Sequence, residues 1–219
     1  MSLTSSTIGR KVAMALSGLF LVLFLTQHFT INIISVFSEA AFNEVSHFMG
    51  NNPLVQFVLQ PVLIFGVIFH FIMGFVLEIQ NRKARIANYA QYKGNASASW
   101  VSRNMIWSGA VVLSFLGLHF YDFWVPEINY KYVEILPLNP DRYYEELVHK
   151  FHDHLRVILY VVSFVFLALH LHHGFASAFQ SMGVNNKYSP GIKKFAVWFA
   201  ILIPVGFIFI ALFHHIKAL

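Results

Sequence analysis

The chain has 219 residues, of which 57% are hydrophobic and 11% charged, and its mean hydropathy is +0.61. This composition is too apolar for an ordinary soluble domain and excludes a disordered chain. The net charge of +5 comes from basic residues beside apolar segments and does not predict nucleic-acid binding, and the absence of cysteine excludes thiolate-held iron–sulfur clusters.

Five uncharged stretches are each long enough to supply the roughly 20 apolar residues that cross a membrane core of about 30 Å as a helix. We therefore predict an all-α integral membrane bundle, a single domain of residues 1–219. The first stretch exceeds the roughly 7–15 residues of a signal-peptide core and lacks a small-residue cleavage site, so we expect it to be retained. The predicted transmembrane helices cover residues 10–38, 54–81, 103–125, 155–182 and 193–216.

Lys and Arg are distributed unevenly between the two sides of this bundle. Ten of the fifteen lie on the side of the N-terminus, whereas the other side has five basic and nine acidic residues. The positive-inside rule predicts a cytoplasmic N-terminus and an outer C-terminus. On the outer side we expect a turn-rich loop at residues 126–140 and a short interfacial helix at residues 141–154. This connection is too short for a soluble catalytic domain.

Four solitary histidines lie deep in four of the apolar stretches. At a rise of ~1.5 Å per residue, His28 and His119 lie about 25 Å from the cytoplasmic ends of their helices, and His70 and His170 lie about 24 Å from the outer ends of theirs. The depth-matched pairs are therefore His28 with His119, near the outer face, and His70 with His170, near the inner face. Two imidazoles per level suit haem b better than zinc, which usually takes three or four protein ligands.

Small residues recur at matched distances from these histidines, so the second half of the chain resembles a rough copy of the first. Nine residues separate a Ser-Gly pair from each outer histidine, so the serine precedes the histidine by eleven positions, and a glycine follows each inner histidine by four. Eleven residues are about three helical turns, which places the Ser-Gly pairs level with the inner histidines. There they would leave room for a porphyrin, although small residues also permit close helix packing. These positions are Ser17, Gly18, Gly74, Ser108, Gly109 and Gly174.

Other polar residues near the inner face are candidates for contacts with haem propionates. His173 lies one turn beyond His170 and is a candidate for bonding a propionate or a quinone, whereas His172 points elsewhere. Basic residues at this face would neutralise propionates, although such residues also anchor topology. They are Arg10, Lys11 and Arg103.

These motifs follow one another in the order Ser17-Gly18, Phe24, His28-x-x-x-Asn32, His70-x-x-x-Gly74, Trp107-Ser108-Gly109, His119, His170-x-x-x-Gly174 and Gly183. In order and approximate spacing, over nearly the whole chain, they resemble the single-chain, five-helix, di-haem cytochrome b subunit of bacterial succinate:quinone oxidoreductases. This family includes succinate dehydrogenases and quinol:fumarate reductases.

The resemblance implies that His70 and His170 ligate an inner haem b and that His28 and His119 ligate an outer one. It implies a bacterial inner-membrane protein whose cytoplasmic face binds a flavoprotein subunit and an iron–sulfur subunit, where succinate is oxidised. Electrons would pass through the two haems to a quinone, which we expect to be menaquinone. Some fumarate-reducing relatives carry a glutamate where this chain has Ala168, which favours the succinate dehydrogenase direction.

A quinone site is expected near the outer haem. Quinone reduction consumes protons and needs a carboxylate or histidine within reach. The candidates are Glu39, Glu44 and Asp122, although carboxylates that flank helices are usually only solvated. His214 and His215 are expected to mark the outer interface.

Three other functions remain as alternatives. A membrane di-iron oxidase or desaturase is suggested by the cluster His170-x-His172-His173, but that chemistry needs several histidine-rich clusters at one level. A transporter or assembly protein could use the histidines to relay protons. The chain could also be the cytochrome b anchor of another quinone-linked enzyme, such as a hydrogenase, because a fold does not fix a function.

Overall fold

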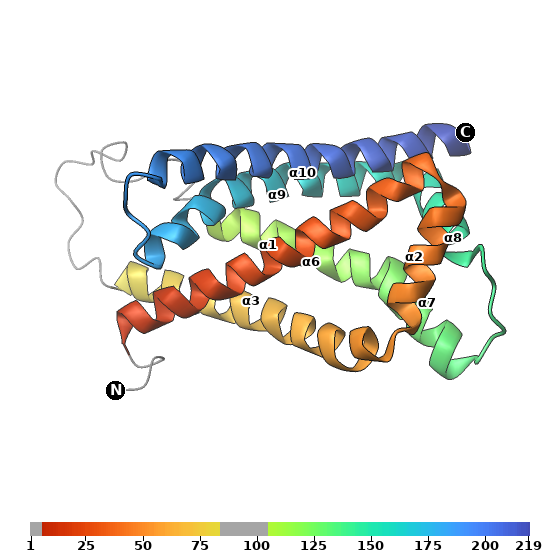
Figure 1. Ribbon diagram of the computed structural model, residues 1–219, viewed down its shortest axis with the longest axis horizontal. Helices are drawn as coiled ribbons and strands as arrows, with labels where there is room; N and C mark the ends of the chain where they lie inside the picture. Colours follow the sequence, from red (N-terminus) through yellow and green to blue (C-terminus); the bar gives the residue numbers. More distant parts are fainter. Residues whose placement is uncertain (1–5, 84–104) are drawn as a thin grey trace.

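The computed structural model describes residues 6–83 and 105–219, and within these ranges the chain is helical without any strand. Five helices are long and apolar enough to cross a membrane, which confirms the predicted all-α fold with five spans (Figure 1). The spans are Thr7–Phe37, Val55–Lys83, Met105–Val133, His154–Ser181 and Ser189–Ala218.

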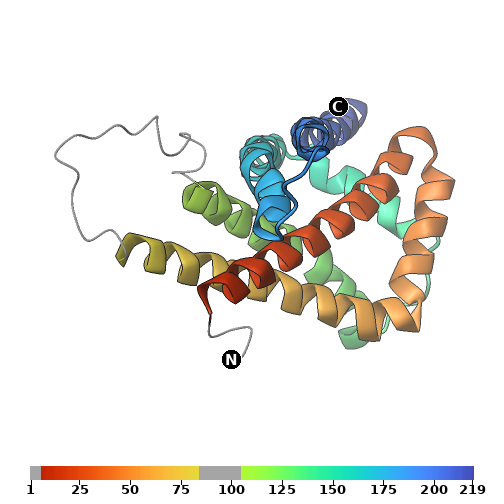
Figure 2. The same ribbon diagram turned by 60° about the vertical axis from the view of Figure 1, so that its left-hand side comes forward.

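Four of the spans pack around a common centre and the fifth lies along their side. Helix α1 packs against α3 and α9, and α6 packs against α9, while α10 covers α9 and α1 (Figures 1 and 2). The bounds of these helices are Thr7–Phe37 for α1, Gln60–Lys83 for α3, Met105–His119 for α6, His154–Ser181 for α9 and Ser189–Ala218 for α10.

Two short helices close one end of the bundle, which we call the α8 end. Helix α2 (Glu39–Asn51) crosses from the end of α1 to η1 (Val55–Leu59), which leads into α3 (Figure 2). The sequence analysis did not identify α2 as a separate helix. Helix α8 (Arg142–His152) matches the interfacial helix expected at residues 141–154.

Side-chain caps fix where several of these helices begin. The Ser6 hydroxyl accepts a hydrogen bond from the Gly9 amide at the start of α1, and the Ser38 hydroxyl caps α2. The Asp153 carboxylate accepts from the amides of Leu155 and Arg156 at the start of α9. Such bonds satisfy amides that have no partner within the helix. Asp153 therefore has a structural role as a helix cap.

The third span is longer than predicted. The expected helix ends at residue 125, but α6 continues through η2 (Phe120–Trp124), α7 (Val125–Ile128) and η3 (Asn129–Val133). Pro126 does not end this helix: it lies in α7, between the π-helical segments η2 and η3, and a membrane bundle can accommodate the main-chain hydrogen bond that a proline removes. The predicted loop at residues 126–140 is therefore helical as far as Val133.

Apolar side chains cover the outside of the bundle as well as its core. Helix α3 has no buried residue, and the exposed fractions of Phe57 and Phe65, on η1 and α3, are 69% and 68%. A helix in water would place such side chains inside. Their exposure is what a lipid-facing helix requires.

Candidate cofactor site between the four central helices

The four solitary histidines meet as two pairs. The ring centroids of His28 and His119 are 5.6 Å apart, with their planes at 85°. The centroids of His70 and His170 are 6.4 Å apart, with their planes at 76°. The structure thus brings together the same partners that the depth argument matches. Each pair takes one histidine from the first two spans and one from the third and fourth.

A serine hydroxyl contacts each histidine of the His70–His170 pair. Ser17 Oγ lies 3.0 Å from His70 Nδ1, and Ser108 Oγ lies 3.4 Å from His170 Nδ1. Each serine also donates its hydroxyl hydrogen to the main-chain carbonyl three residues earlier, at 2.8 and 2.9 Å. Its oxygen is therefore left to accept a hydrogen from Nδ1, which favours the tautomer with a free lone pair on Nε2.

The glycines after these serines lie directly against the imidazoles. A Cβ atom on Gly18 would lie 3.2 Å from His70 Cε1, and one on Gly109 would lie 3.4 Å from His170 Cε1. The sequence analysis expects these positions to leave room for a porphyrin. In the structure, their small size makes room for the histidine rings themselves.

The two glycines that follow the inner histidines lie against methionines. A Cβ atom on Gly74 would lie 3.5 Å from Met14 Cε, and one on Gly174 would lie 2.9 Å from Met105 Cε. Because methionine is flexible, these contacts tolerate small shifts. Neither glycine therefore lies against a rigid neighbour in this structure, and their expected role of making room for a porphyrin stays a prediction.

The internal repeat predicted from the serines and glycines extends to other side chains. The residues at positions 14, 17, 18, 24 and 28 of α1 recur, at one constant offset, at positions 105, 108, 109, 115 and 119. Phe24 stacks on His28 with centroids 5.4 Å apart, and Phe115 stacks on His119 at 5.7 Å. The two halves of the bundle therefore hold their histidines by the same contacts.

The His28–His119 pair has fewer polar neighbours. Asn32 Nδ2 lies 3.4 Å from His28 Nε2 and donates to the His28 carbonyl at 2.8 Å. Phe207 of α10 packs against the His28 ring at 5.8 Å. The Nδ1 atom of His119 is buried and has no hydrogen-bond partner within residues 6–83 and 105–219. An orphaned imidazole nitrogen of this kind is a candidate for binding a group from outside the chain.

Of the three carboxylates proposed for a quinone site, only Asp122 is buried. Glu39 and Glu44 on α2 are exposed, whereas Asp122 has an exposed fraction of 1%. One Asp122 oxygen accepts from the Tyr160 hydroxyl at 2.9 Å, and the other pairs with the Arg156 guanidinium at 2.9 Å. Both partners lie on α9, and the sequence analysis missed them.

The remaining candidates for propionate contacts near the inner face differ in how exposed they are. Arg10 is half-buried, and its Nε atom is buried without a partner among the described residues, while Lys11 is exposed. His173 is half-buried and lies 3.5 Å from the Ser177 hydroxyl, and His172 is exposed. Arg103 lies outside the described residues. Arg10 and His173 therefore remain positioned to contact a bound group.

His214, at the end of α10, does not face solvent. Its side chain is fully buried, and its Nε2 lies 2.8 Å from the Ser35 hydroxyl of α1. Its neighbour His215 is half-buried, with Nδ1 2.6 Å from the Phe151 carbonyl. Both histidines join α10 to other helices, because their partners lie on α1 and α8 and not in solvent.

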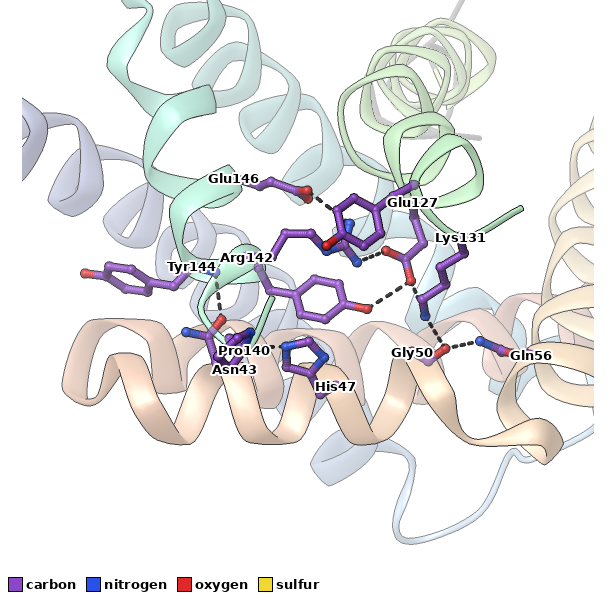
Figure 3. A network of polar contacts seen from close by, with 12 residues as sticks. Asn43, His47, Gly50, Gln56, Glu127, Lys131, Pro140, Arg142, Tyr144 and Glu146 are labelled. Carbon is purple, nitrogen blue, oxygen red and sulfur yellow. Dashed lines mark hydrogen bonds and ion pairs between the residues drawn. The ribbon is translucent and has the colours of Figure 1, made fainter. Parts of the chain in front are cut away.

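A polar network that the sequence analysis also missed joins α2, α7, η3 and α8 (Figure 3). The Glu127 carboxylate pairs with Arg142 and with Lys131 Nζ at 2.5 Å, and it accepts from the Tyr143 hydroxyl at 2.9 Å. Burial, with the nearby Glu127 charge, raises the pKa of Tyr143, so the phenol remains a donor. Burial also raises the pKa of Glu146, although its ion pair with Arg142 opposes this effect.

Fold and site together define a helical protein with five potential membrane spans and two pairs of half-buried histidines. No protein-family profile matches the chain, and no curated protein or solved structure matches it either. The resemblance drawn from its motifs therefore stays a prediction.

Proposed function

We propose that this chain is the membrane-anchor cytochrome b subunit of a succinate:quinone oxidoreductase. In this proposal it carries electrons between a cytoplasmic flavoprotein and iron–sulfur module and a membrane quinone, expected to be menaquinone. The observation that carries the proposal is the presence of two histidine pairs at separate levels of one apolar bundle. Two pairs suit two electron carriers placed in series across a membrane.

The residues of both pairs fit haem b. His70 and His170 would hold one group and His28 and His119 the other, since each site offers two facing imidazoles from opposite halves of the bundle. Ser17 is placed to accept from the Nδ1 of His70 and fix its ring, as the outer partners of metal-bound histidines commonly do. When bound, haem b supplies reversible one-electron transfer.

Basic residues support the expected orientation. Arg82 and Lys83 lie in the last turn of α3, and Arg10 and Lys11 in the first turns of α1, away from α8. We propose that this end faces the cytoplasm and binds the flavoprotein and iron–sulfur subunits, with the α8 end outside. The positive-inside rule supports this orientation, and the inner membrane of a bacterium is the expected location.

A di-iron oxidase is less well supported. Within the described ranges, no group of three or more His, Asp or Glu side chains is placed to hold a metal ion. A di-iron centre needs more ligands at one point than a pair of histidines offers. An anchor for another respiratory enzyme, such as a hydrogenase, would use the same two pairs, so only the partner subunits distinguish it.

The test is to extract the full chain, with the subunits that accompany it, from the host membrane in mild detergent. We expect two haem b per chain by pyridine haemochrome assay and a flavin-containing partner with succinate dehydrogenase activity. A colourless sample, or one haem per chain, would overturn the di-haem assignment. Two haems with a hydrogenase as the partner would overturn the assignment to succinate and keep the electron-transfer role.

A further inference from the structure

An ion pair between a fully buried carboxylate and a half-buried guanidinium lies one helical turn beyond His119. Asp122 belongs to η2, which follows α6 without a break, and its side chain is fully shielded from solvent. Arg156 and Tyr160 are one turn apart on α9, so their side chains project from the same face. The Arg156 guanidinium pairs with one oxygen of the Asp122 carboxylate, and the Tyr160 hydroxyl donates a hydrogen bond to the other.

Stability alone is a poor explanation for such a pair. Removing the Asp122 charge from water costs several kcal/mol, whereas the Arg156 side chain stays 23% exposed, and apolar replacements of a buried pair are often neutral or stabilising. The pair also lies among aromatic rings, because Tyr160 packs on Phe115 at 5.0 Å and on Phe151 at 5.3 Å. In surroundings of low dielectric constant, charges act on their neighbours more strongly than they do in water.

The neighbour within reach is the His28–His119 pair. The Tyr160 ring lies 6.3 Å from the His119 ring, and its hydroxyl bonds to Asp122. The other ion pairs of the described residues are Glu78–Arg82 and the pairs within the network of Figure 3. Among the ion pairs of the described residues, Asp122–Arg156 is therefore the one connected to a paired histidine: Tyr160 bonds to Asp122 and its ring lies near His119.

We propose that Asp122 and Arg156 set the reduction potential of the redox centre held by His28 and His119. This inference rests on the proposed function. The negative charge of Asp122 stabilises the oxidised, more positive state of that centre, and the positive charge of Arg156 stabilises the reduced state. Tyr160 is a positioning residue, because it holds the carboxylate beside His119.

The experiment is a spectroscopic redox titration of the purified complex carrying Asp122→Asn or Arg156→Gln. We expect Asp122→Asn to raise the midpoint potential of the haem held by His28 and His119, and Arg156→Gln to lower it. The haem held by His70 and His170 should shift less in both variants. A loosened fold would shift the midpoint potential of this haem in the same direction in both variants. Shifts of opposite sign therefore indicate an effect of charge.

Two further variants serve as controls. Tyr160→Phe keeps both charges and should shift the potential less than Asp122→Asn. Glu127→Gln removes a carboxylate five residues further along the same span and should leave both midpoint potentials near those of the unmodified complex, because the separation is larger.

The proposal is overturned if both haems remain and neither charge variant moves a potential, or if both variants move it in the same direction. It is also overturned if both variants lose only the His28–His119 haem, because the pair would then act in retaining that group. Absence of haem from the unmodified complex is a different outcome, which contradicts the proposed function itself.

Discussion

Ser17 Oγ lies 3.0 Å from His70 Nδ1, and this contact joins α1 to α3 inside the bundle. Ser108 and His170 repeat it between α6 and α9 at 3.4 Å. A histidine held in this way has its ring orientation and its tautomer set by the protein. Both imidazoles of the His70–His170 pair are thus oriented by the same kind of contact with a serine hydroxyl.

Replacing one histidine of a pair should affect the haem of that pair and leave the other haem bound. We expect His119→Ala to lose one haem b and to keep the haem held by His70 and His170, because the two pairs share no ligand. The measurement is the haem-to-protein ratio with reduced-minus-oxidised spectra at low temperature. His172→Ala is the control and should keep both haems, since His172 is exposed. Two haems in the His119→Ala variant would contradict the ligand assignment.

Enlarging a glycine should displace an imidazole. A Cβ atom on Gly109 would already be in contact with His170 Cε1, at 3.4 Å, so we expect the two further methyl groups of Gly109→Val to displace the ring. We expect loss of the haem held by His70 and His170, with the other haem retained. Gly117→Val, in the same helix, is the matched control because a Cβ atom there meets nothing within 4 Å. Equal haem loss from both variants would show that the effect is general disruption of α6.

A third prediction concerns the buried bond between α1 and α10. Ser35→Ala leaves His214 Nε2 without its 2.8 Å partner, and an unpaired buried polar group costs about 1–3 kcal/mol. We expect the free energy of unfolding in detergent to fall by about that amount. The control is Ser114→Ala, because Ser114 is exposed and bonds only to its own helix. An unchanged stability in Ser35→Ala would mean that His214 finds another partner.

A fourth prediction concerns Gly50, where an added side chain would meet the polar network of Figure 3. A Cβ atom there would collide with the Tyr143 hydroxyl and would lie 3.2 Å from Lys131 Nζ and 3.3 Å from Glu127 Oε1. Overpacking typically costs about 1–3 kcal/mol, so Gly50→Ala should lower the thermal unfolding temperature. Alanine otherwise favours a helix over glycine by about 1 kcal/mol. The control Gly191→Ala, in open space on α10, should therefore not be destabilising.

The pairing of the histidines was predictable because it depends on helix length alone. Once the ends of the spans are known, a constant rise per residue gives the depth of His28, His70 and their partners. Charge and hydropathy locate those ends without knowledge of the packing. This is why the five spans and the partners within each pair could be derived from one sequence.

Burial at the α8 end was not predictable in the same way. Glu39, Glu44 and Asp122 are equivalent as acidic residues beside apolar segments, and only tertiary structure shows that Asp122 faces Tyr160 and Arg156. The burial of His214 was equally unpredictable, because its partner Ser35 lies 179 residues earlier in the sequence. Helix α2 was missed because it lies between two long apolar segments and is too short to form a span of its own.

The repeated halves have a consequence for biogenesis. Each histidine pair draws one member from α1 or α3 and the other from α6 or α9. A nascent chain with only its first two spans in the bilayer therefore carries two half-sites and completes neither. The His28–His119 pair is complete once the third span has inserted, and the His70–His170 pair only after the fourth. On the proposed function, binding of a second haem would therefore report that insertion of the four central spans is finished.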